Sequence, residues 1–268
     1  MSKTKTREKL AWKMRLKILE LACYSKSHYP HVGSCLSCID LLLETIVFQM
    51  KKNDKFILSK GHASLAWYVI LNHQNKITDK ELLTYFKDST EFGIHPPSTR
   101  QKDIPLPTGS LGHGLSFASG LAKAYMLDNP RKPNRVFCVM SDGECNEGAV
   151  WEAALFASHH KLYNLTVLID KNKFQAFGKT KDVLGDAASS EKWKSFGFNV
   201  VECDGHNFSS LEKAFFKFKK KNNGRPNLII CNTIRGMGVK ELQGKLSSNY
   251  TSITPELYDE IVKRSKNI

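Results

Sequence analysis

The 268-residue sequence lacks a run of 18 or more apolar residues, which a membrane-spanning helix requires. It also lacks the uninterrupted apolar core of a signal peptide. The basic N-terminal segment instead repeats apolar residues at helical spacing, as at Leu10, Met14, Ile18 and Leu21. Internal repeats and low-complexity segments are missing too. We therefore expect a cytoplasmic protein without a membrane partner, folded as a single domain over residues 1–268.

Cysteine occurs seven times, an odd number, and without the spacing of a disulfide framework. Cys35 and Cys38 form a CxxC in "GSCLSCIDLLL". Such a pair is either a redox or zinc motif or two small residues on a buried helix. Because neither a second CxxC nor a histidine-rich partner follows, the buried helix is the favoured interpretation.

Negative charge is in deficit, and the formal net charge is +14. A basic surplus can indicate a nucleic-acid partner, an anionic membrane surface or a general compositional bias. The lysines are scattered apart from "KAFFKFKKKNN", where phenylalanines recur at helical spacing and lysines occupy the solvated face. No DNA- or RNA-reading motif accompanies this segment, so we expect no nucleic-acid partner. The GxGxxG dinucleotide motif is also absent after a first strand.

Hydrophobic periodicity predicts an α/β fold. Helices are expected over residues 7–28, 35–49, 62–72, 78–87, 113–127, 147–161, 189–196, 208–221 and 254–265. Strands are expected over residues 56–58, 135–140, 164–170, 198–204 and 226–233. The last four strands are almost continuously apolar and alternate with helices. This pattern is typical of a doubly wound, mainly parallel sheet with helices on both faces.

Polar side chains follow two of these strands. In "MSDGECNEGAVWEAA", Asp142 comes directly after the 135–140 strand, and Asp170 with Asn172 ends the 164–170 strand. If the strands are neighbours, these groups lie at one edge of the sheet, where Mg²⁺ or Ca²⁺ would find oxygen ligands. Gly143 permits close backbone approach, and the following helix offers its N-terminus to an anion. The pattern favours a metal–phosphate site, with an ordinary turn as the alternative.

Four histidines stand beside glycine or proline in separate loops, at His31, His62, His95 and His113. A lone histidine is more often structural. Several in inter-element loops can converge on one cleft and exchange protons there.

Several motifs occur in the order found in one family. They are "HYPHVGSCLSCIDLL", "DKFILSKGHASLAWY", "GIHPP", "PTGSLGHGLSFASGLA", and "SDGECNEGAVWEAA" followed by "DKNKF". Across residues 10–240 the chain resembles the N-terminal, diphosphate-binding half of transketolases. It is most similar to the shorter chain of a split transketolase. Asp142 and Asn172 are 30 residues apart, as in the thiamine-diphosphate motif of that family.

The resemblance implies a set of functional residues. Asp142, the side chain of Asn172 and the backbone carbonyl of Phe174 would bind Mg²⁺ or Ca²⁺, which would bridge the two phosphates of thiamine diphosphate. The residues that would contact the cofactor are His62, Gly109, Ser110, Leu111, Asp142, Gly143, Glu144 and Asn172. The residues assigned to catalysis are His31, His62 and His95, which would handle protons and hydroxyls, and Glu147, which would support a relay across a subunit interface.

The resemblance also implies an activity and a partner. The activity is transfer of a two-carbon ketol unit from a ketose to an aldose, on sugar or sugar-phosphate substrates. The pyrimidine-binding domain would come from a separate C-terminal transketolase chain, in a heterotetramer. Three positions depart from the family pattern: Ser141 replaces the first glycine of GDG, His113 replaces a glutamine, and Asn249 stands where relatives have histidine. The last departure implies altered substrate choice, an offset in the match or lost activity.

Three other readings stay open. A thiamine-dependent component that decarboxylates 2-oxo acids is disfavoured, because the set His31, His62 and His95 suits polyhydroxylated substrates. A non-catalytic scaffold subunit would keep the fold without turnover. A basic nucleic-acid-binding module would show salt-sensitive binding to random DNA. The sugar could belong to central or to specialised metabolism.

Overall fold

The computed structural model describes residues 3–25, 31–219 and 223–265. These residues contain a five-stranded sheet with the strand order β1-β2-β3-β5-β4, in which all neighbouring pairs are parallel. The strands are β1 (Lys55–Leu58), β2 (Val136–Ser141), β3 (Leu165–Lys171), β4 (Asn199–Asp204) and β5 (Asn227–Asn232). Each of the five predicted strands is present, with bounds within one residue of the expectation.

The central strands form because their apolar runs are covered on both faces. In β2, Phe137 and Val139 belong to one buried cluster, whereas Cys138 and Met140 belong to the other. This alternation follows from the two-residue period of a strand. β4 is an edge strand, and most of its residues stay partly exposed.

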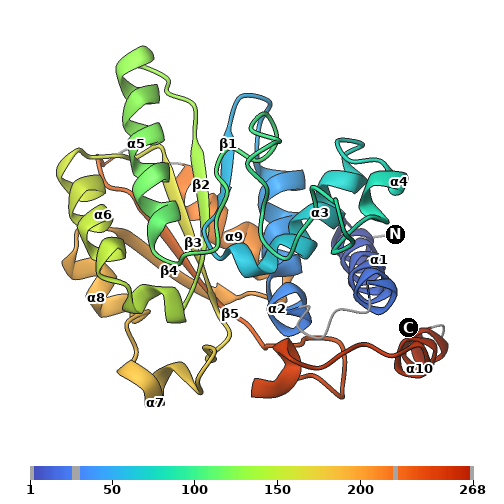
Figure 1. Cartoon of the computed structure of the whole chain (residues 1–268). Helices are drawn as coiled ribbons and strands as arrows, with labels where there is room; N and C mark the ends of the chain where they lie inside the picture. Colours follow the sequence, from blue (N-terminus) through green and yellow to red (C-terminus); the bar gives the residue numbers. More distant parts are fainter. Residues whose placement is uncertain (1–2, 26–30, 220–222, 266–268) are drawn as a thin grey trace.

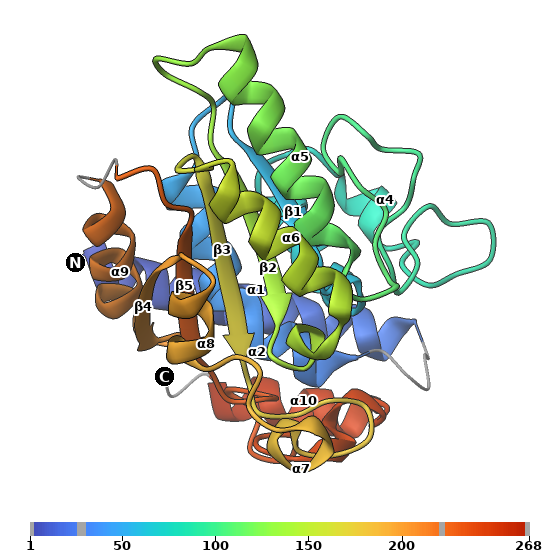
Figure 2. The same ribbon diagram turned by 90° about the vertical axis from the view of Figure 1, so that its left-hand side faces the viewer.

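Helices cover both faces of the sheet (Figure 1). One layer holds α1 (Lys3–Tyr24), α2 (Val32–Leu43), α3 (Ser64–His73) and α9 (Phe208–Lys219). The other layer holds α5 (His113–Asp128), α6 (Gly148–His159) and α8 (Ser190–Ser195), and Figure 2 shows α5 and α6 in front of the strands. The predicted doubly wound α/β architecture is therefore confirmed.

The helix that carries the CxxC lies in the protein core. Together with a π-helical turn at Glu44–Gln49, α2 forms an 18-residue stretch, Val32–Gln49, with a mean hydropathy of 1.5, of which 89% is buried inside the protein. The high hydropathy thus has a packing explanation. Cys35 and Cys38 are buried free thiols, and burial raises the pKa of Cys35 to about 11. The buried-helix interpretation of the CxxC is confirmed.

Some predicted helix bounds were wrong. The helix expected over residues 78–87 is only α4 (Asp79–Leu82), which begins with a capping box between Thr78 and Glu81. Beyond it the chain turns, with Phe86 in a left-handed conformation at φ 56°. The aromatic ring of Tyr85 is buried beside Tyr68, with ring centroids 6.3 Å apart, and this packing competes with a further helical turn. α1 begins at Lys3, before the expected start at residue 7, and ends at Tyr24. Residues 26–28 of that same expectation, and residues 220–221 of the helix expected over 208–221, lie outside the described residues.

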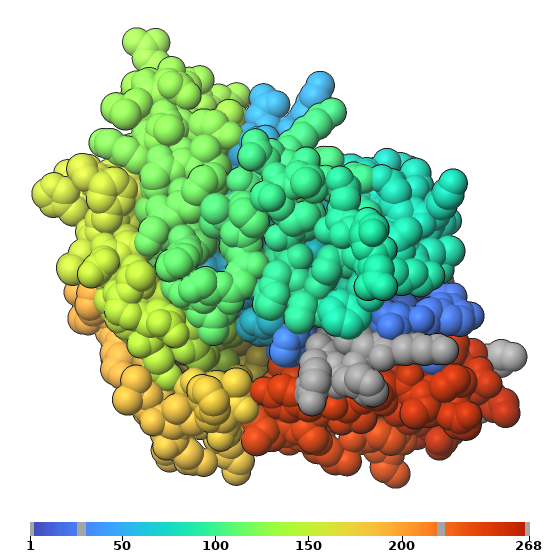
Figure 3. Space-filling model, in the orientation of Figure 1, coloured from blue at the N-terminus to red at the C-terminus, as the bar shows by residue number. Residues whose placement is uncertain are grey.

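The carboxyl ends of all five strands meet at one edge of the sheet. Figure 2 shows this edge at the bottom, beside α7 (Thr180–Leu184) and α10 (Pro255–Ser265). In Figure 3, residues near 175–185 (yellow) meet residues near 235–253 (red) below the green loop that precedes α5. The five-residue helix α7 was not predicted. This edge of the sheet carries the residues singled out by the sequence motifs.

Candidate functional site

Asp142 presents one carboxylate oxygen that its neighbours do not use. It follows β2 and opens a short 3-10 helix at Gly143–Asn146, and it is 1% exposed. Its Oδ2 accepts hydrogen bonds from the backbone N–H of Lys173 and the hydroxyl of Thr180, both at 2.9 Å. Its Oδ1 is buried without a hydrogen-bond partner among the described residues. Burial raises the pKa of Asp142 to about 6. A cation bound at Oδ1 would offset the free-energy cost of burying the ionised carboxylate.

Asn172 lies at the end of the neighbouring strand, as the sequence predicted. Ser141 of β2 pairs with Asp170 of β3, which places the two strand ends side by side. The Asn172 amide donates from Nδ2 to Asp170 at 3.1 Å, and its Oδ1 accepts from the backbone N–H of Phe174 at 3.1 Å. These bonds fix which way the amide points. Its oxygen therefore faces the turn that contains the Phe174 carbonyl.

Asp170 of β3 positions Asn172 through buried contacts. It is fully buried and contacts the ammonium of Lys60, which is also fully buried. It also accepts a hydrogen bond from Ser37 Oγ at 2.6 Å and another from the Thr233 hydroxyl. Burial alone would raise the pKa of Asp170, but the charge of Lys60 and these hydrogen bonds hold it below its ordinary value. With its oxygens engaged in this way, Asp170 holds Asn172 in place.

Clusters of three or more His, Cys, Asp or Glu side chains suited to a metal are absent from the described part of the chain. The ligand set implied by the resemblance is of another kind, with one carboxylate, one amide and one backbone carbonyl. Such a set is typical of hard cations that prefer oxygen. The unpartnered Oδ1 of Asp142 is the feature that fits a cation here.

Three of the four singled-out histidines converge. His31 precedes α2 in a left-handed conformation at φ 48°, His62 lies in the 3-10 helix Gly61–Ala63 before α3, and His95 comes from the long loop. The ring centroid of His31 is 5.8 Å from that of His62 and 6.5 Å from that of His95. His113 is exposed at the first residue of α5.

The clustered histidines favour their neutral forms. Burial lowers the pKa of His31 to about 4, with smaller effects of His95, Arg235 and Lys60. Burial, followed by the charge of Lys60, lowers the pKa of His62 well below its ordinary value, and burial also lowers that of His95. Each ring thus offers one donor and one acceptor nitrogen near neutral pH. The Nδ1 atom of His31 is buried without a hydrogen-bond partner within the described ranges.

The glycine-rich loop packs closely against this cluster. A Cβ atom on Gly109 would lie 3.1 Å from Cδ2 of His95, and one on Gly61 would lie 2.5 Å from the backbone carbonyl carbon of Thr108. Gly61 therefore needs to be glycine, whereas a side chain at Gly109 would require the His95 ring to shift by a few tenths of an ångström. Residues 110 and 111 follow as an exposed serine and a partly buried leucine, so the segment assigned to the cofactor stays accessible.

Glu144 links the glycine-rich loop to the sheet through hydrogen bonds. It is fully buried, and its carboxylate accepts from the backbone N–H groups of Gly112 at 2.9 Å and Ser141 at 3.3 Å, and from the hydroxyl of Ser59. This side chain thus joins the ends of β1 and β2 to the start of α5. Its assigned contact with a cofactor stays a prediction.

Gly143 and Glu147 lie on either side of Glu144. A Cβ on Gly143 would lie 3.0 Å from Cγ of Gln175, so the chain passes close to the turn after β3. Glu147 precedes α6 and is exposed. Its place at the surface is compatible with the relay across an interface that the resemblance implies, which stays a prediction.

Arg235 is a site residue that the sequence analysis missed. It is 2% exposed, donates from Nη1 to the Gln175 carbonyl at 3.2 Å, and lies 5.7 Å from the ring centroid of Phe174. Its Nε has no hydrogen-bond partner among the described residues, and none of their carboxylates forms an ion pair with it. Burial lowers its pKa. The signal in the sequence was "TIRGMG", a basic residue between a strand end and a glycine turn.

The comparisons with known proteins agree with this geometry. Residues 41–264 match the family described as "Transketolase, thiamine diphosphate binding domain". The chain belongs to this family. It is 34% identical over 241 residues to the 6-deoxy-6-sulfo-D-fructose transketolase subunit SqwG of Clostridium sp. (strain MSTE9), covering 87% of this chain and 86% of that protein. It is also 34% identical over 248 residues to a subunit of the apulose-4-phosphate transketolase of Actinobacillus succinogenes, covering 89% and 88%.

A solved structure shows the same fold. The crystal structure of transketolase from Campylobacter jejuni matches 99% of this chain with a TM-score of 0.87 at 25% identity. The match covers 43% of that transketolase, so this chain spans less than half the length of the solved enzyme. The expected resemblance to the diphosphate-binding half of transketolases is confirmed.

Asn249 is a structural residue in this member of the family. It is 6% exposed, and its amide donates to Ser34 Oγ at 2.9 Å and accepts from the Ser34 backbone N–H at 2.8 Å. It therefore caps the start of α2. The next residue, Tyr250, lies beside the histidines instead, with its ring centroid 6.4 Å from that of His31. Its hydroxyl donates to the Ala176 carbonyl at 3.4 Å.

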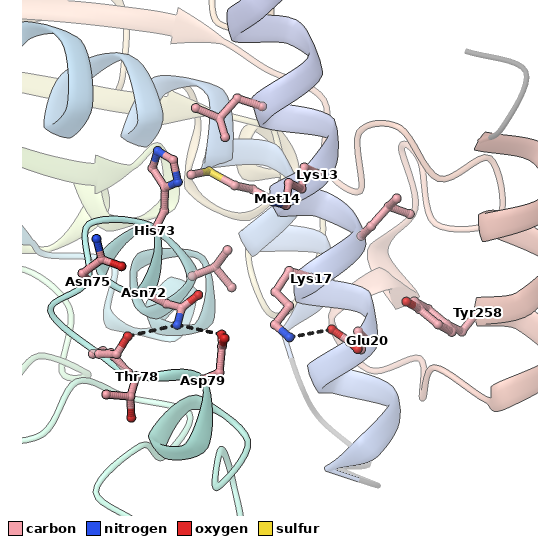
Figure 4. Close-up of a pocket in the computed structure, with 14 residues that line it drawn as sticks. Lys13, Met14, Lys17, Glu20, Asn72, His73, Asn75, Thr78, Asp79 and Tyr258 are labelled. Carbon is pink, nitrogen blue, oxygen red and sulfur yellow. Dashed lines mark hydrogen bonds and ion pairs between the residues drawn. The ribbon is translucent and has the colours of Figure 1, made fainter.

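The predicted site is distinct from a cavity elsewhere in the molecule. Figure 4 shows a cavity of about 640 Å³ between α1 and α3, lined by residues such as Met14, His73 and Tyr258. The residues assigned to the cofactor, the metal or catalysis do not line this cavity. The candidate site lies instead among loops at the edge of the sheet.

Proposed function

We propose that this chain is the thiamine-diphosphate- and Mg²⁺-dependent subunit of a two-chain transketolase that acts in the cytoplasm. It transfers a two-carbon ketol unit from a ketose to an aldose. The observation that carries this proposal is the buried, unpartnered Oδ1 of Asp142, held at the end of β2 beside Asn172 at the end of β3. Membership of the thiamine diphosphate binding family supports the cofactor.

The residues at this edge fit a metal-bound diphosphate. Asp142 Oδ1, Asn172 Oδ1 and the carbonyl of Phe174 would hold Mg²⁺, or Ca²⁺ in its place. Arg235 adds a buried positive charge without a carboxylate partner in the described ranges, which suits a diphosphate. When bound, thiamine diphosphate supplies the electron sink for the chemistry of the two-carbon unit.

The histidine cluster suits a polyhydroxylated substrate. His31, His62 and His95 come from three elements and are held neutral by burial, so their nitrogens can both donate to and accept from hydroxyl groups. Such groups can also take a proton from a substrate hydroxyl and return it. Tyr250 adds a phenol ring at the same cluster.

A separate chain is proposed to cover the site. The two relatives reported above are named as transketolase subunits, which supports a division between chains. Large apolar side chains are exposed next to the site, with Phe177 at 88%, Leu184 at 67% and Val183 at 40% exposure. They form a surface that another chain would bury. We place the pyrimidine-binding chain there, within a heterotetramer.

The substrate is proposed to be a ketose that is phosphorylated or otherwise specialised. One relative is named for 6-deoxy-6-sulfo-D-fructose and the other for apulose 4-phosphate. Both names describe a sugar with an anionic group. We infer the same class for this chain.

The proposal is tested by mixing this chain with a candidate pyrimidine-binding chain and assaying ketol transfer. We expect turnover only when both chains, thiamine diphosphate and Mg²⁺ are present, and loss of turnover when a chelator removes the metal. Release of carbon dioxide from a 2-oxo acid, without ketol transfer, would instead favour the decarboxylating class. Tight cofactor binding by the two-chain complex without turnover of any ketose would favour a scaffold.

A surface variant tests the place of the partner. Phe177→Asp should weaken association of the two chains by about tenfold or more, because a charge enters an apolar contact. Leu127→Asp is the matched control, since Leu127 is 68% exposed at the far end of α5. Equal association of both variants would contradict the proposed surface.

A further inference from the structure

A second hollow lies at the opposite edge of the sheet from the candidate site. It has a volume of about 1140 Å³. It forms where residues 50–54, which lead into β1, meet residues 129–135, which lead into β2 (Figure 1, upper ends of these strands). Phe215 and Phe218 of α9 also line it. None of the residues assigned above to cofactor, metal or catalysis takes part in this lining.

The rim of this cavity is strongly basic. The cationic residues that line it are Lys51, Lys52, Arg131, Lys132 and Arg135, and among its described lining residues the only carboxylate is Asp54. That carboxylate is already occupied, because Arg135 donates to it from Nη2 at 2.5 Å and from Nε at 3.1 Å.

The other four cations of this rim have no carboxylate partner among the described residues. For Lys51, Lys52, Arg131 and Lys132, the side chains are exposed, and the described ranges supply no ion-pair partner. Like charges gathered around a hollow repel each other and raise the local concentration of anions. The rim therefore suits a ligand with several negative charges.

The buried part of the lining combines aromatic side chains, Phe137 and Phe215, with polar ones, Asn164, Thr166 and Asn227. Phe137 and Phe215 are buried with ring centroids 6.3 Å apart, whereas Phe48 is 37% exposed and Phe218 is partly exposed. The guanidinium of Arg135 lies 4.9 Å from the ring centroid of Phe137, which places positive charge directly beside the aromatic part of the lining. A ligand that fills this space needs an apolar or flat part as well as charge, because a bare anion would leave the exposed parts of Phe48 and Phe218 in water.

We propose that this cavity binds a nucleoside polyphosphate. The phosphates lie against Lys51, Lys52, Arg131 and Lys132. The base packs against Phe218 and against the part of Phe48 that the Arg7 guanidinium, 4.4 Å from its ring centroid, leaves exposed. The volume of about 1140 Å³ lies just above the range of about 300 to 1000 Å³ for small-molecule sites, and it suits a nucleotide better than an inorganic anion. Because the site lies at the amino ends of the strands, it is separate from the proposed cofactor site.

Calorimetric titration of the full chain with ATP tests this proposal. We expect micromolar binding at about 50 mM salt that weakens at about 200 mM salt. The double variant Lys52→Glu/Arg131→Glu should bind at least about tenfold more weakly, because two attractive charges become repulsive. Lys194→Glu on α8 is the matched control and should bind as the wild type does. Both altered residues are exposed, so we expect the double variant to fold as the wild type does. Equal thermal unfolding temperatures of the two proteins check this.

Three further titrations test the alternatives, which are ATP binding in the cofactor site, binding through the phosphates alone, and binding of a nucleic acid. Saturating thiamine diphosphate with Mg²⁺ should leave ATP binding unchanged, and competition between the two would place ATP in the cofactor site and overturn the proposal. Inorganic tripolyphosphate should bind about tenfold more weakly than ATP, and equal affinity would overturn the assignment of the base. A single-stranded oligonucleotide that binds more tightly than ATP and is lost in the same double variant would replace the small ligand by a nucleic acid. Absence of ATP binding by the wild type would also refute the proposal.

Discussion

The buried ion pair beneath the site makes a strong prediction about stability. Lys60 and Asp170 are both fully buried, and Asp170 in turn holds the amide of Asn172 at 3.1 Å. Replacing Lys60 by methionine keeps most of the unbranched side chain, which ends one atom short of the ammonium, and removes the charge. Asp170 would then be a buried carboxylate that keeps its hydrogen bonds but loses its counter-ion.

The expected cost follows from this burial. Breaking a buried ion pair by removing one partner destabilises a protein by about 3–5 kcal/mol, because the other charge stays behind without compensation. Asp170→Asn should cost a similar amount by leaving the ammonium of Lys60 unpaired. The double variant should recover part of the loss, which gives a coupling energy of at least about 1 kcal/mol in a double-mutant cycle.

The pH dependence gives a second signature of the same pair. In the wild type the pKa of Asp170 lies below its ordinary value, so its stabilising contribution is present near neutral pH and is lost as the pH falls through that lowered pKa. In Lys60→Met, burial dominates and raises the pKa of Asp170. The stability of the variant should therefore fall as the pH rises above about 4.

Urea unfolding followed by tryptophan fluorescence measures these effects, since the chain has four tryptophans. Each variant is compared with the wild type at pH 5 and pH 7.5. A loss below about 1 kcal/mol in Lys60→Met, or a coupling energy of zero, would refute the reasoning. The matched control is Lys192→Met, because this lysine is exposed and outside the site.

Further predictions concern the histidines, a cap and a tight contact. The pKa of His31 falls from 6.5 to about 4 on folding, so up to about 3 kcal/mol of stability is present above pH 6.5 and is lost as the pH falls to 4. His31→Gln should remove this pH-dependent part of the stability, and an unchanged pH slope of the unfolding free energy in urea would contradict the prediction. Asn249→Ala should cost about 1–3 kcal/mol in thermal unfolding, because the buried N–H of Ser34 loses its acceptor, and a loss below about 0.5 kcal/mol would argue against this cap. Gly61→Ala should weaken thiamine diphosphate binding by about tenfold or more in calorimetry, since its Cβ would lie 2.5 Å from the backbone of Thr108 and displace the glycine loop; unchanged affinity would contradict this.

The sheet was predictable because its signal is local. The central strands are buried on both faces, so they appear as short apolar runs with few polar interruptions. The neighbouring positions of Asp142 and Asn172 followed from parallel topology, since consecutive βαβ strands usually pair. In contrast, α4 stops at Leu82 because distant aromatic packing overrides its helical periodicity, and a window of sequence cannot contain that information.

The residues that hold the site in place were not predictable either, because their partners are distant in the sequence. Lys60 stands in "SKGHA" like any polar residue after a strand, and only its contact with Asp170, 110 positions away, shows that it is buried. The cap at the start of α2 likewise joins Asn249 to Ser34 across 215 positions. Motifs point to the residues proposed to contact a cofactor, whereas the residues that hold them in place depend on the assembled fold.

The central claim is that a metal-bound thiamine diphosphate occupies the edge formed by β2 and β3. Calorimetric titration of thiamine diphosphate with Mg²⁺, in the presence of the pyrimidine-binding chain, tests it most directly. Asp142→Asn is the critical variant, because an amide can still accept from Lys173 and Thr180 while it presents NH₂ where the cation would bind. Asp182→Ala on α7, an exposed carboxylate, is the control. The account predicts micromolar, Mg²⁺-dependent binding that is lost in Asp142→Asn and retained in Asp182→Ala. Binding that is equal in Asp142→Asn and the wild type, or absent from both, would contradict it.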